Sequence, residues 1–472
     1  MMSWRYRLVI VVLALTAFWP VLHLGFLWDD HVMIETNPSM THWSLSVLRE
    51  DFTTDAFRGQ GDAYYRPAQI LTNRVDYTLW GLRPFGYHLT NLLTHALNAL
   101  LAAELVAAFG FSALVALSTG CLLAVHPIVV EQLMIVAGRA ELFGLCFTLL
   151  TLLVLFRKGV PSATTASFLF FMGLLYKESV LVLPLLAVLC FALRRERAER
   201  YLRILWLLPV IPVYLWLRHH AVGPVALAID PHLASIFFFK AFPQVLLRYL
   251  TLLGFPWNLH SHRMMPSLTH WWPALFVLLI GLAAGLIWKR RKTGLFCLAW
   301  FIVCLLPKTP IMMTGNFTLD HWVYPGAIGV FLPLSIFFAA QWDRRDQRIH
   351  RWMGLLFFPL LIAWALMSRL NIELRGTDEK MYRWALHFTT SHPIQQNLGI
   401  TLLQQGRALE AIPFLENVRA VYPEDARNTF ILARAYSEAG YPQAAYSLLK
   451  ILAHRQPPYE PALRILSTIK QP

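Results

Sequence analysis

Long apolar runs recur along the first 370 residues and are separated by short polar segments. Since about 20 apolar residues cross the hydrocarbon core of a bilayer as a helix, the pattern predicts an all-α, polytopic membrane helix bundle. We expect about 11 spans, near 8–27, 88–109, 111–125, 140–156, 162–176, 179–193, 203–218, 272–288, 294–307, 324–341 and 352–369. A further stretch, 235–254, is interrupted by Lys240, Pro243 and Arg248, and we expect it to be interfacial or re-entrant.

The composition agrees with a membrane protein: 57% of the residues are hydrophobic, 14% are charged, and the mean hydropathy is +0.50. The net charge of +14 comes from basic residues between apolar runs, which is typical of cytoplasmic loops and argues against a nucleic-acid partner. All five cysteines lie inside apolar runs, so we interpret them as small core residues rather than as a disulfide framework or a metal-ligand set. The first run lacks a small-residue cleavage site, which predicts an uncleaved anchor.

Clusters of Lys and Arg occupy alternate loops, and this alternation predicts the orientation of the bundle. The cytoplasmic side takes Arg5 and Arg7, Arg157 and Lys158, 194–203, 289–292 and 344–351. The opposite, outer face then takes the first outer loop 28–87, the segments around His126, Lys177 and His260, the loop 308–323, and everything after Leu370. Every candidate functional residue falls on this outer face.

From Asn371 onward the sequence is polar and repeats itself at an offset of 34 residues. The matching pairs are Gly399/Ala433, Leu402/Tyr436, Gly406/Gly440, Ala411/Ala445 and Pro423/Pro457. This period predicts a tetratricopeptide (TPR) solenoid of α-hairpins over 371–472, following a membrane domain at 1–370; a plain helical tail is the alternative. Because about three repeats are needed for stability, the array would lean on the membrane domain or on a partner.

Asp29 and Asp30 directly follow the first apolar run, at the water boundary, where ionisation is cheap. They form either a solvated helix end or a functional acid pair. The first outer loop is rich in Trp, Tyr and Arg, and long loops on a rigid scaffold tend to carry function, which favours the second reading.

Five motifs stand in order along the chain: Phe26-Leu27-Trp28-Asp29-Asp30, Tyr65-Arg66-Pro67, Pro84-Phe85-Gly86-Tyr87-His88-Leu89-Thr90-Asn91, His126-Pro127 through Glu131 to Gly138-Arg139-Ala140-Glu141-Leu142, and Tyr176-Lys177-Glu178. Together with the repeats they resemble the transmembrane-and-TPR O-mannosyltransferases and their bacterial relatives, which are GT-C membrane glycosyltransferases. The resemblance implies a GT-C-type bundle that transfers a sugar, mannose in the better-known branch, from a polyprenyl-phosphate carrier to a hydroxyl of a protein or glycan. An acidic residue of the first outer loop would be the general base of an inverting displacement.

Asp29 matches the first acid of the family's pair, so the resemblance assigns it the role of base, and Asp30 would orient the acceptor or hold a metal. A lipid-phosphate donor also needs cations near the bilayer edge, and the predicted topology places Arg66, Arg139 and Lys177 there. For Arg139 the alternative is an ion pair with Glu141 or Glu131.

The neighbouring polar residues are supporting candidates. His126 and Glu131 are five residues apart and are predicted to pair. Lys177-Glu178 either marks a turn or aims the lysine at a phosphate, with the acid fixing it. The remaining candidates are His260 and Arg263 after the interrupted stretch, and Asp320, His321 and Tyr324 at the start of the tenth span. The better-known branch has Glu-Arg-Tyr where this chain has Asp320-His321-Trp322, so a phosphate role of His321 would depend on pH.

No compact metal-ligand spacing occurs, so we expect no certain cofactor; Asp30 and His31 are the candidates if a divalent metal binds, and a polar hydrated cavity is the alternative. The expected partners are the sugar-carrying lipid, the membrane, and an acceptor engaged through the repeats. Two other functions remain open: a transporter or flippase, which would place charges at the midplane and show two related halves, and a non-catalytic TPR scaffold. Outer loops without paired cysteines favour a bacterial inner membrane with a periplasmic site over an ER membrane with a lumenal one.

Overall fold

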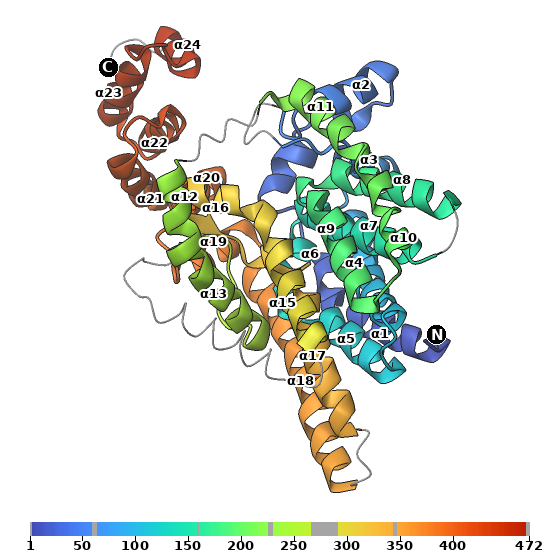
Figure 1. The fold of residues 1–472 in the computed structure, drawn as a ribbon. Coiled ribbons are helices and arrows are strands. Elements are labelled where there is room, and N and C mark those ends of the chain that lie inside the picture. Colours follow the sequence, from blue (N-terminus) through green and yellow to red (C-terminus); the bar gives the residue numbers. More distant parts are fainter. Residues whose placement is uncertain are drawn as a thin grey trace. The chain divides into compact units, whose positions relative to one another are not determined.

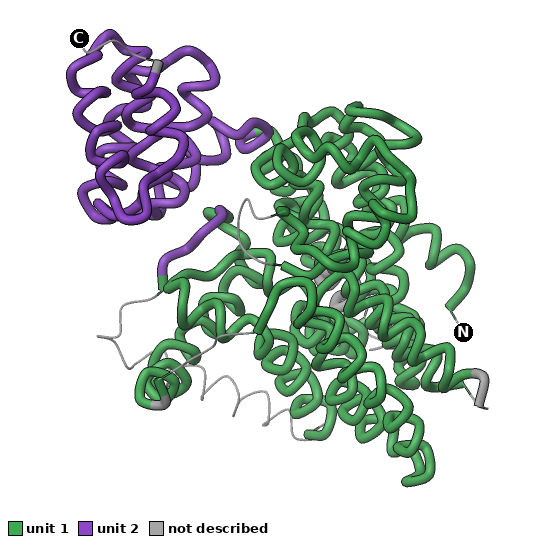
Figure 2. Tube along the Cα trace, turned by 90° about the horizontal axis from the view of Figure 1, so that it is seen from above, with its two compact units in different colours: residues 1–259, 265–373 green, residues 260–264, 374–472 purple. Residues whose placement is uncertain are grey.

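The computed structural model describes residues 2–58, 64–157, 160–224, 230–265, 291–342 and 347–468. These residues form two compact units (Figure 2): unit 1 comprises 1–259 and 265–373, and unit 2 comprises 260–264 and 374–472. Each unit is described by itself below.

Unit 1 is helical almost throughout its described residues. Its α-helices are α1 (Trp4–Phe18), α2 (Leu45–Thr53), α3 (Pro67–Trp80), α4 (Pro84–Ala108), α5 (Ala113–Val125), α6 (Val130–Met134), α7 (Arg139–Leu155), α8 (Val160–Tyr176), α9 (Leu183–Arg194), α10 (Ala198–Tyr201), α11 (Val210–Val222), α12 (Pro231–Ile236), α13 (Phe242–Gly254), α15 (Arg291–Leu305), α16 (Thr309–Gly315), α17 (Ala327–Trp342) and α18 (Gln347–Arg375), which continues into unit 2. Short 3-10 or π turns connect them: η1 (Trp19–His23), η2 (His31–Glu35), η3 (Pro38–Thr41), η4 (Pro127–Val129), η5 (Val136–Gly138), η6 (Glu178–Val182), η7 (Ile204–Leu207), η8 (Phe237–Ala241), η10 (Leu306–Lys308) and η11 (Asp320–Val323). Strand β2 (Phe317–Thr318) belongs to unit 1 and strand β1 (Arg263–Met264) to unit 2.

Helix α4 is the centre of unit 1 and packs against α1, α5 and α7 (Figure 1). Four fully buried polar side chains, His88, Asn91, His95 and Asn98, recur every three or four residues along it and therefore share one face. They bond to backbone carbonyls between the end of α5 and the start of α7: His88 to Leu133, Asn91 to Gln132 and Val136, His95 to Ala124, and Asn98 to Leu142. This polar stripe thus supplies partners to the backbone where the chain is irregular between α5 and α7, which is a requirement at membrane depth.

The structure confirms a helical membrane bundle, with fewer full-length spans than expected. Within the described ranges, seven helices are long and apolar enough to cross a bilayer, or eight if the bent pair 113–125 and 127–134 is one span. The predicted spans 162–176 and 324–341 form shorter apolar helices, and 179–193 divides into η6 and the 12-residue α9. The predicted span 272–288 lies outside the described residues.

Two breaks in the apolar pattern have different outcomes. Pro127 follows α5 directly, and the helix axis turns by 47° there, because proline removes a backbone donor. The stretch 235–254, which we expected to be interfacial or re-entrant, instead forms part of a helical segment of spanning length, 232–254. Its Pro243 is the second residue of α13, directly after the π turn η8, so the hydrogen-bond pattern of the helix is irregular where the proline lacks its N–H.

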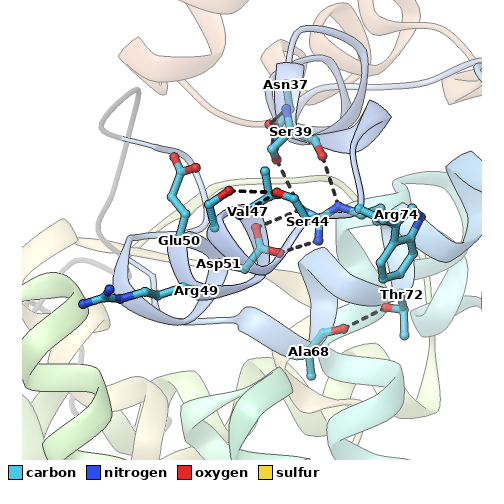
Figure 3. Close-up of polar contacts among 12 residues, drawn as sticks. Asn37, Ser39, Ser44, Val47, Arg49, Glu50, Asp51, Ala68, Thr72 and Arg74 are labelled. Atoms are coloured by element: carbon cyan, nitrogen blue, oxygen red, sulfur yellow. Dashed lines mark hydrogen bonds and ion pairs between the residues drawn. The ribbon is translucent and has the colours of Figure 1, made fainter.

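The first outer loop is held in place by a buried ion pair. Arg74 of α3 and Asp51 of α2 are both fully buried; Arg74 Nη2 lies 2.9 Å from Asp51 Oδ1, and its Nε donates to the backbone oxygen of Ser39 at 3.0 Å (Figure 3). Arg58 adds a second cation, with Nη2 3.0 Å from Asp51 Oδ1. The Asp51–Arg74 pair thus joins α2 to α3, and Arg74 joins both to η3, which ties together these described parts of the loop.

Unit 2 is a stack of helical hairpins: α19 (Asp378–Leu386), α20 (His392–Gln404), α21 (Ala408–Val421), α22 (Ala426–Glu438), α23 (Pro442–Ala453) and α24 (Glu460–Thr468). The pair α22–α23 begins 34 residues after α20–α21 at both helices, which confirms the predicted period. Gly399 lies at the crossing, where a Cβ would come 2.7 Å from Leu415 side-chain atoms. Small residues at these positions allow the helices of each hairpin to pack closely.

Replacing Asp51 by Asn should destabilise unit 1 by about 3–5 kcal/mol, because the buried Arg74 guanidinium loses its counter-charge. Thermal unfolding of the purified protein in detergent measures this loss. Glu50→Gln is the matched control: Glu50 lies beside Asp51 on the same helix but is exposed, and its change should cost less than about 1 kcal/mol. Equal unfolding temperatures for the two variants would contradict the role assigned to the buried pair.

Candidate functional site

A cavity of about 130 Å³ in unit 1 collects charged residues from six separate segments. Its polar lining comprises Asp29, Tyr64, Arg66, Glu131, Gln132, Glu141, Lys177, Glu178, Lys308 and His321, with Trp28 and Trp322 among its aromatic walls. Nearly all of these side chains stand where a helix is interrupted or ends. Interrupted helices therefore bring together charges that are far apart in the sequence, at one end of the predicted spans.

The centre of the cavity is a carboxylate shared by two lysines. Lys177 Nζ lies 2.8 Å from Glu141 Oε2, and Lys308 Nζ lies 2.8 Å from the same oxygen and 2.9 Å from Oε1. All three side chains are at least 90% buried. Glu141 also lies in the first turn of α7, where the helix dipole favours an anion. Two ammonium groups and one carboxylate leave one surplus positive charge.

Arg66 adds a third cation to the cavity lining. Its guanidinium stacks over the Tyr64 ring at 4.2 Å, and its Nη2 lies 3.8 Å from Glu178 Oε1, a distance too long for a hydrogen bond. Its buried Nε has no hydrogen-bond partner in the described part of the chain. Arg66 thus keeps donor capacity that an anionic ligand would fill.

Asp29 lines the same cavity and is partly exposed, whereas its neighbour Asp30 is completely buried. The turn that separates Asp29 from the first span has Trp28 in the left-handed region at φ 52°, which is uncommon for a residue other than glycine. This turn presents Asp29 to the cavity and Asp30 to the protein interior.

Asp30 holds two segments of the chain together. Its Oδ2 accepts hydrogen bonds from the backbone N–H groups of Leu27 (3.1 Å) and Val136 (2.9 Å), and its Oδ1 accepts one from Ala137 (2.8 Å). Burial raises the pKa of Asp30 to about 7, and the three backbone donors oppose this rise. With both oxygens occupied, Asp30 is placed to position the cavity wall rather than to contact an acceptor or a metal.

His31 Nδ1 contacts the carboxylate of Glu35, four residues later in η2. Among the residues that the structure describes, there is no group of three or more His, Cys, Asp or Glu side chains that could hold a metal ion.

Arg139, which we expected at the donor phosphate or paired with Glu131 or Glu141, is not among the residues that line the cavity. It is fully buried, forms an ion pair with Asp76, and donates from Nε to Asn91 Oδ1 at 3.0 Å. The geometry therefore supports a structural role for Arg139. Its partner Asp76 lies on α3, and no local spacing pointed to it.

The expected pairing of His126 with Glu131 does not form. His126 Nδ1 accepts from the Ile128 N–H at 3.1 Å, and its Nε2 lies 3.1 Å from the backbone oxygen of Leu253. Glu131 instead lies against His321, with 3.0 Å between Oε1 and Nδ1, and both line the cavity. The break at Pro127 separates His126 from the helix that carries Glu131, so a spacing rule for a continuous helix does not apply.

The other predicted residues lie outside the cavity lining. Tyr324 is buried, with its hydroxyl 2.9 Å from His95 Nδ1, and Asp320 is buried in η11. His260 and Arg263 belong to unit 2, where the His260 ring stacks on Phe388 with 5.1 Å between centroids.

Lys308 is the site residue that the sequence analysis missed. It ends η10 directly after the apolar helix α15, in the same way that Lys177 follows α8. The signal used for Lys177, a lysine at the outer end of an apolar run, would have identified it.

Comparison with known proteins agrees with both parts of the chain. A tetratricopeptide repeat family model matches residues 402–468, which confirms the predicted repeats. The chain is similar to Protein O-mannosyl-transferase Tmtc1 of Drosophila melanogaster, with 29% identity over 199 residues, 40% of this chain and 23% of the relative. It is also similar to human Protein O-mannosyl-transferase TMTC3, with 33% identity over 159 residues, 32% of this chain and 17% of the relative. The matched segments thus span about a fifth of the length of these relatives.

Replacing Asp30 by Asn should lower the thermal stability of the protein by about 1–3 kcal/mol, because an amide NH₂ then faces a backbone N–H that needs an acceptor. Asp29→Asn is the matched control, since Asp29 accepts none of these three bonds; its unfolding temperature in detergent should stay near that of the parent. An Asp30→Asn variant that unfolds with the parent would refute the positioning role.

Proposed function

We propose that this protein is a membrane glycosyltransferase that moves a sugar from a polyprenyl-phosphate carrier to a hydroxyl group of an acceptor protein on the non-cytoplasmic face. The observation that carries the proposal is that one cavity is lined by Asp29, a candidate base, and by three cations, Arg66, Lys177 and Lys308. The similarity to proteins named O-mannosyl-transferases supports mannose as the sugar.

In the proposed reaction, the acceptor hydroxyl attacks the anomeric carbon of the sugar and gives its proton to Asp29. A bond forms between the acceptor oxygen and the anomeric carbon, and the bond from that carbon to the carrier's phosphate oxygen breaks. A single displacement of this kind inverts the sugar configuration. The leaving polyprenyl phosphate takes the bonding electron pair, and nearby cations stabilise its growing charge.

The charges immediately around Glu141 suit this leaving group, whereas the lining as a whole carries four carboxylates (Asp29, Glu131, Glu141 and Glu178) against three cations. Lys177 and Lys308 share Glu141, so the pair carries one surplus positive charge, and Arg66 supplies hydrogen-bond donors. A phosphate placed between them would receive charge-assisted hydrogen bonds, which are about twice as strong as neutral ones. Glu141 would offset the mutual repulsion of the two ammonium groups and orient them while the site is empty.

We further propose that unit 2 binds the acceptor protein or a partner through its TPR helices, a common use of such solenoids. We propose a bacterial inner membrane with a periplasmic site as the location, on the sequence argument that the outer loops lack paired cysteines. An ER membrane with a lumenal site is the alternative location, and the proposed chemistry is the same in both.

Asp29→Asn should reduce sugar transfer by about 10²–10⁴-fold, since it removes the general base while leaving the cavity walls in place. The assay follows a labelled sugar from a polyprenyl-phosphate donor to a protein acceptor, with enzyme shown to be folded by its unfolding temperature. Asp230→Asn is the matched control: Asp230 is an exposed N-cap outside the cavity lining, and Asn caps helices equally well. Transfer by Asp29→Asn at the parental rate would rule out Asp29 as the base.

Binding of a polyprenyl phosphate should weaken as the pH rises through about 8. Burial lowers the pKa of Lys177 to about 8, and the nearby Lys308 and Arg66 charges act in the same direction, although Glu141 opposes them. Because the phosphate binds the ammonium form, affinity is full below this pKa and is lost above it. Titration of a short-chain polyprenyl phosphate by calorimetry between pH 6 and about 10 measures the effect.

The lysine variants separate the two contributions to donor binding. Lys177→Gln should remove most of the pH-dependent step, whereas Lys308→Gln should lower the affinity about tenfold or more at neutral pH. Lys450→Gln, in the solenoid, is the control and should change neither value. An affinity that stays constant to pH 10 in the parent protein would contradict the assignment of Lys177 to the phosphate.

A further inference from the structure

Unit 1 contains a second, larger cavity of about 590 Å³ at the other ends of the predicted spans. It lies where α4 and α9 end, where α5 and α15 begin, and where α17 ends. The basic-loop count places all of these helix ends on the cytoplasmic side. None of the proposed catalytic residues lines this cavity.

The polar lining of this cavity is cationic. It consists of Arg195, Arg291, Lys292, Thr293 and Ser112, and the described residues that line it include no Asp or Glu. Arg195 is the left-handed C-cap of α9, with φ 53°, and Arg291 and Lys292 form the start of the described part of α15. Three positive charges therefore line one cavity, and the described part of its lining offers no carboxylate.

These three cations have no ion pair within the described residues, unlike their neighbours. Arg194 and Arg200 both pair with Glu196, at 3.1 Å and 2.6 Å. Glu196 is thus already engaged by these two neighbours, and neither Glu196 nor Glu199 lines the cavity. All three are exposed, so solvent screens their mutual repulsion, and their position around one cavity attracts an anionic ligand.

An apolar groove of about 360 Å³ adjoins the cationic cavity. Its lining comes from α1, α5, α17 and α18 and is apolar except for Ser118 and Cys121. Ala339 of α17 lines both the groove and the cationic cavity. The two spaces therefore share a wall, with charge at the helix ends and hydrocarbon side chains along the helices.

We propose that these two spaces together bind one anionic phospholipid of the cytoplasmic leaflet. The phosphate would lie among Arg195, Arg291 and Lys292, and an acyl chain would occupy the groove beside Ala339. Basic pockets between membrane helices on the cytoplasmic side are suited to anionic head groups, and the groove matches a chain that a free phosphate lacks. The site is separate from the proposed transferase cavity and does not depend on that function.

Native mass spectrometry of the full-length protein with phosphatidylglycerol and with phosphatidylcholine tests this proposal. The parent protein should bind phosphatidylglycerol in preference. Arg291→Gln and Lys292→Gln should each weaken this binding about fivefold, the effect of removing roughly 1 kcal/mol of attraction per cation. The matched control is Arg197→Gln. Arg197 is an exposed cation in the basic loop that contains Arg195, and it does not line the cavity, so its replacement should leave the affinity unchanged. An equal loss in Arg197→Gln would mean general surface attraction and would overturn the proposal.

A variant in the apolar groove distinguishes the binding of a lipid from the binding of a soluble anion. Ala365 is a half-buried groove residue of α18, and Ala365→Phe would fill space that the acyl chain needs. This variant should weaken phosphatidylglycerol binding, while inorganic phosphate alone should compete poorly against the lipid. If inorganic phosphate displaces the lipid at equal concentration, or if Ala365→Phe binds lipid like the parent, the acyl-chain part of the proposal is wrong. Sugar transfer is not a readout here, so this result leaves the proposed function untouched.

Discussion

The candidate site depends on one buried carboxylate that accepts three backbone hydrogen bonds. Asp30 joins the turn after the first span to the η5 segment, more than 100 residues later in the chain, through Leu27, Val136 and Ala137. Both of these segments are irregular, so their N–H groups have no helical partner and would be costly to bury alone. By satisfying them, Asp30 places Asp29 on one side of the cavity and the η5 wall on another. Gly138 completes this wall, since a Cβ there would lie 2.5 Å from the Gln132 Cα.

A second constraint governs the charges themselves. Ionised side chains are stable when buried only if they are paired, and in this cavity Lys177 and Lys308 both pair with Glu141. Each comes from the point where a helix is interrupted: η5 to α7, α8 to η6, and η10 to α16. Helix breaks are costly in a membrane, and here they let charged groups reach one cavity without crossing the apolar parts of the spans.

The sequence predicted the parts of this structure that depend on local pattern. Hydropathy predicted most of the helices, and the 34-residue offset predicted the repeats. Asp29 and Lys177 were predicted at the outer ends of spans, and both line the cavity. The sequence did not predict which buried polar side chains pair with one another. Arg139 pairs with Asp76, 63 residues away, rather than with the acids nearby, because α3 and α4 deliver Asp76 and Asn91 to it. Likewise, His126 was separated from Glu131 by a helix break whose angle depends on packing.

The polar stripe on α4 also has a consequence for how the chain enters the membrane. His88, Asn91, His95 and Asn98 find their partners mainly in the segment 124–142, which the ribosome makes later. Until that segment emerges, α4 would expose four polar side chains to lipid or to the insertion machinery. Such side chains make the membrane insertion of a single helix less favourable. We therefore expect α4, α5 and α7 to enter the bilayer as a group, because the polar side chains of α4 have these partners only when the later helices are present.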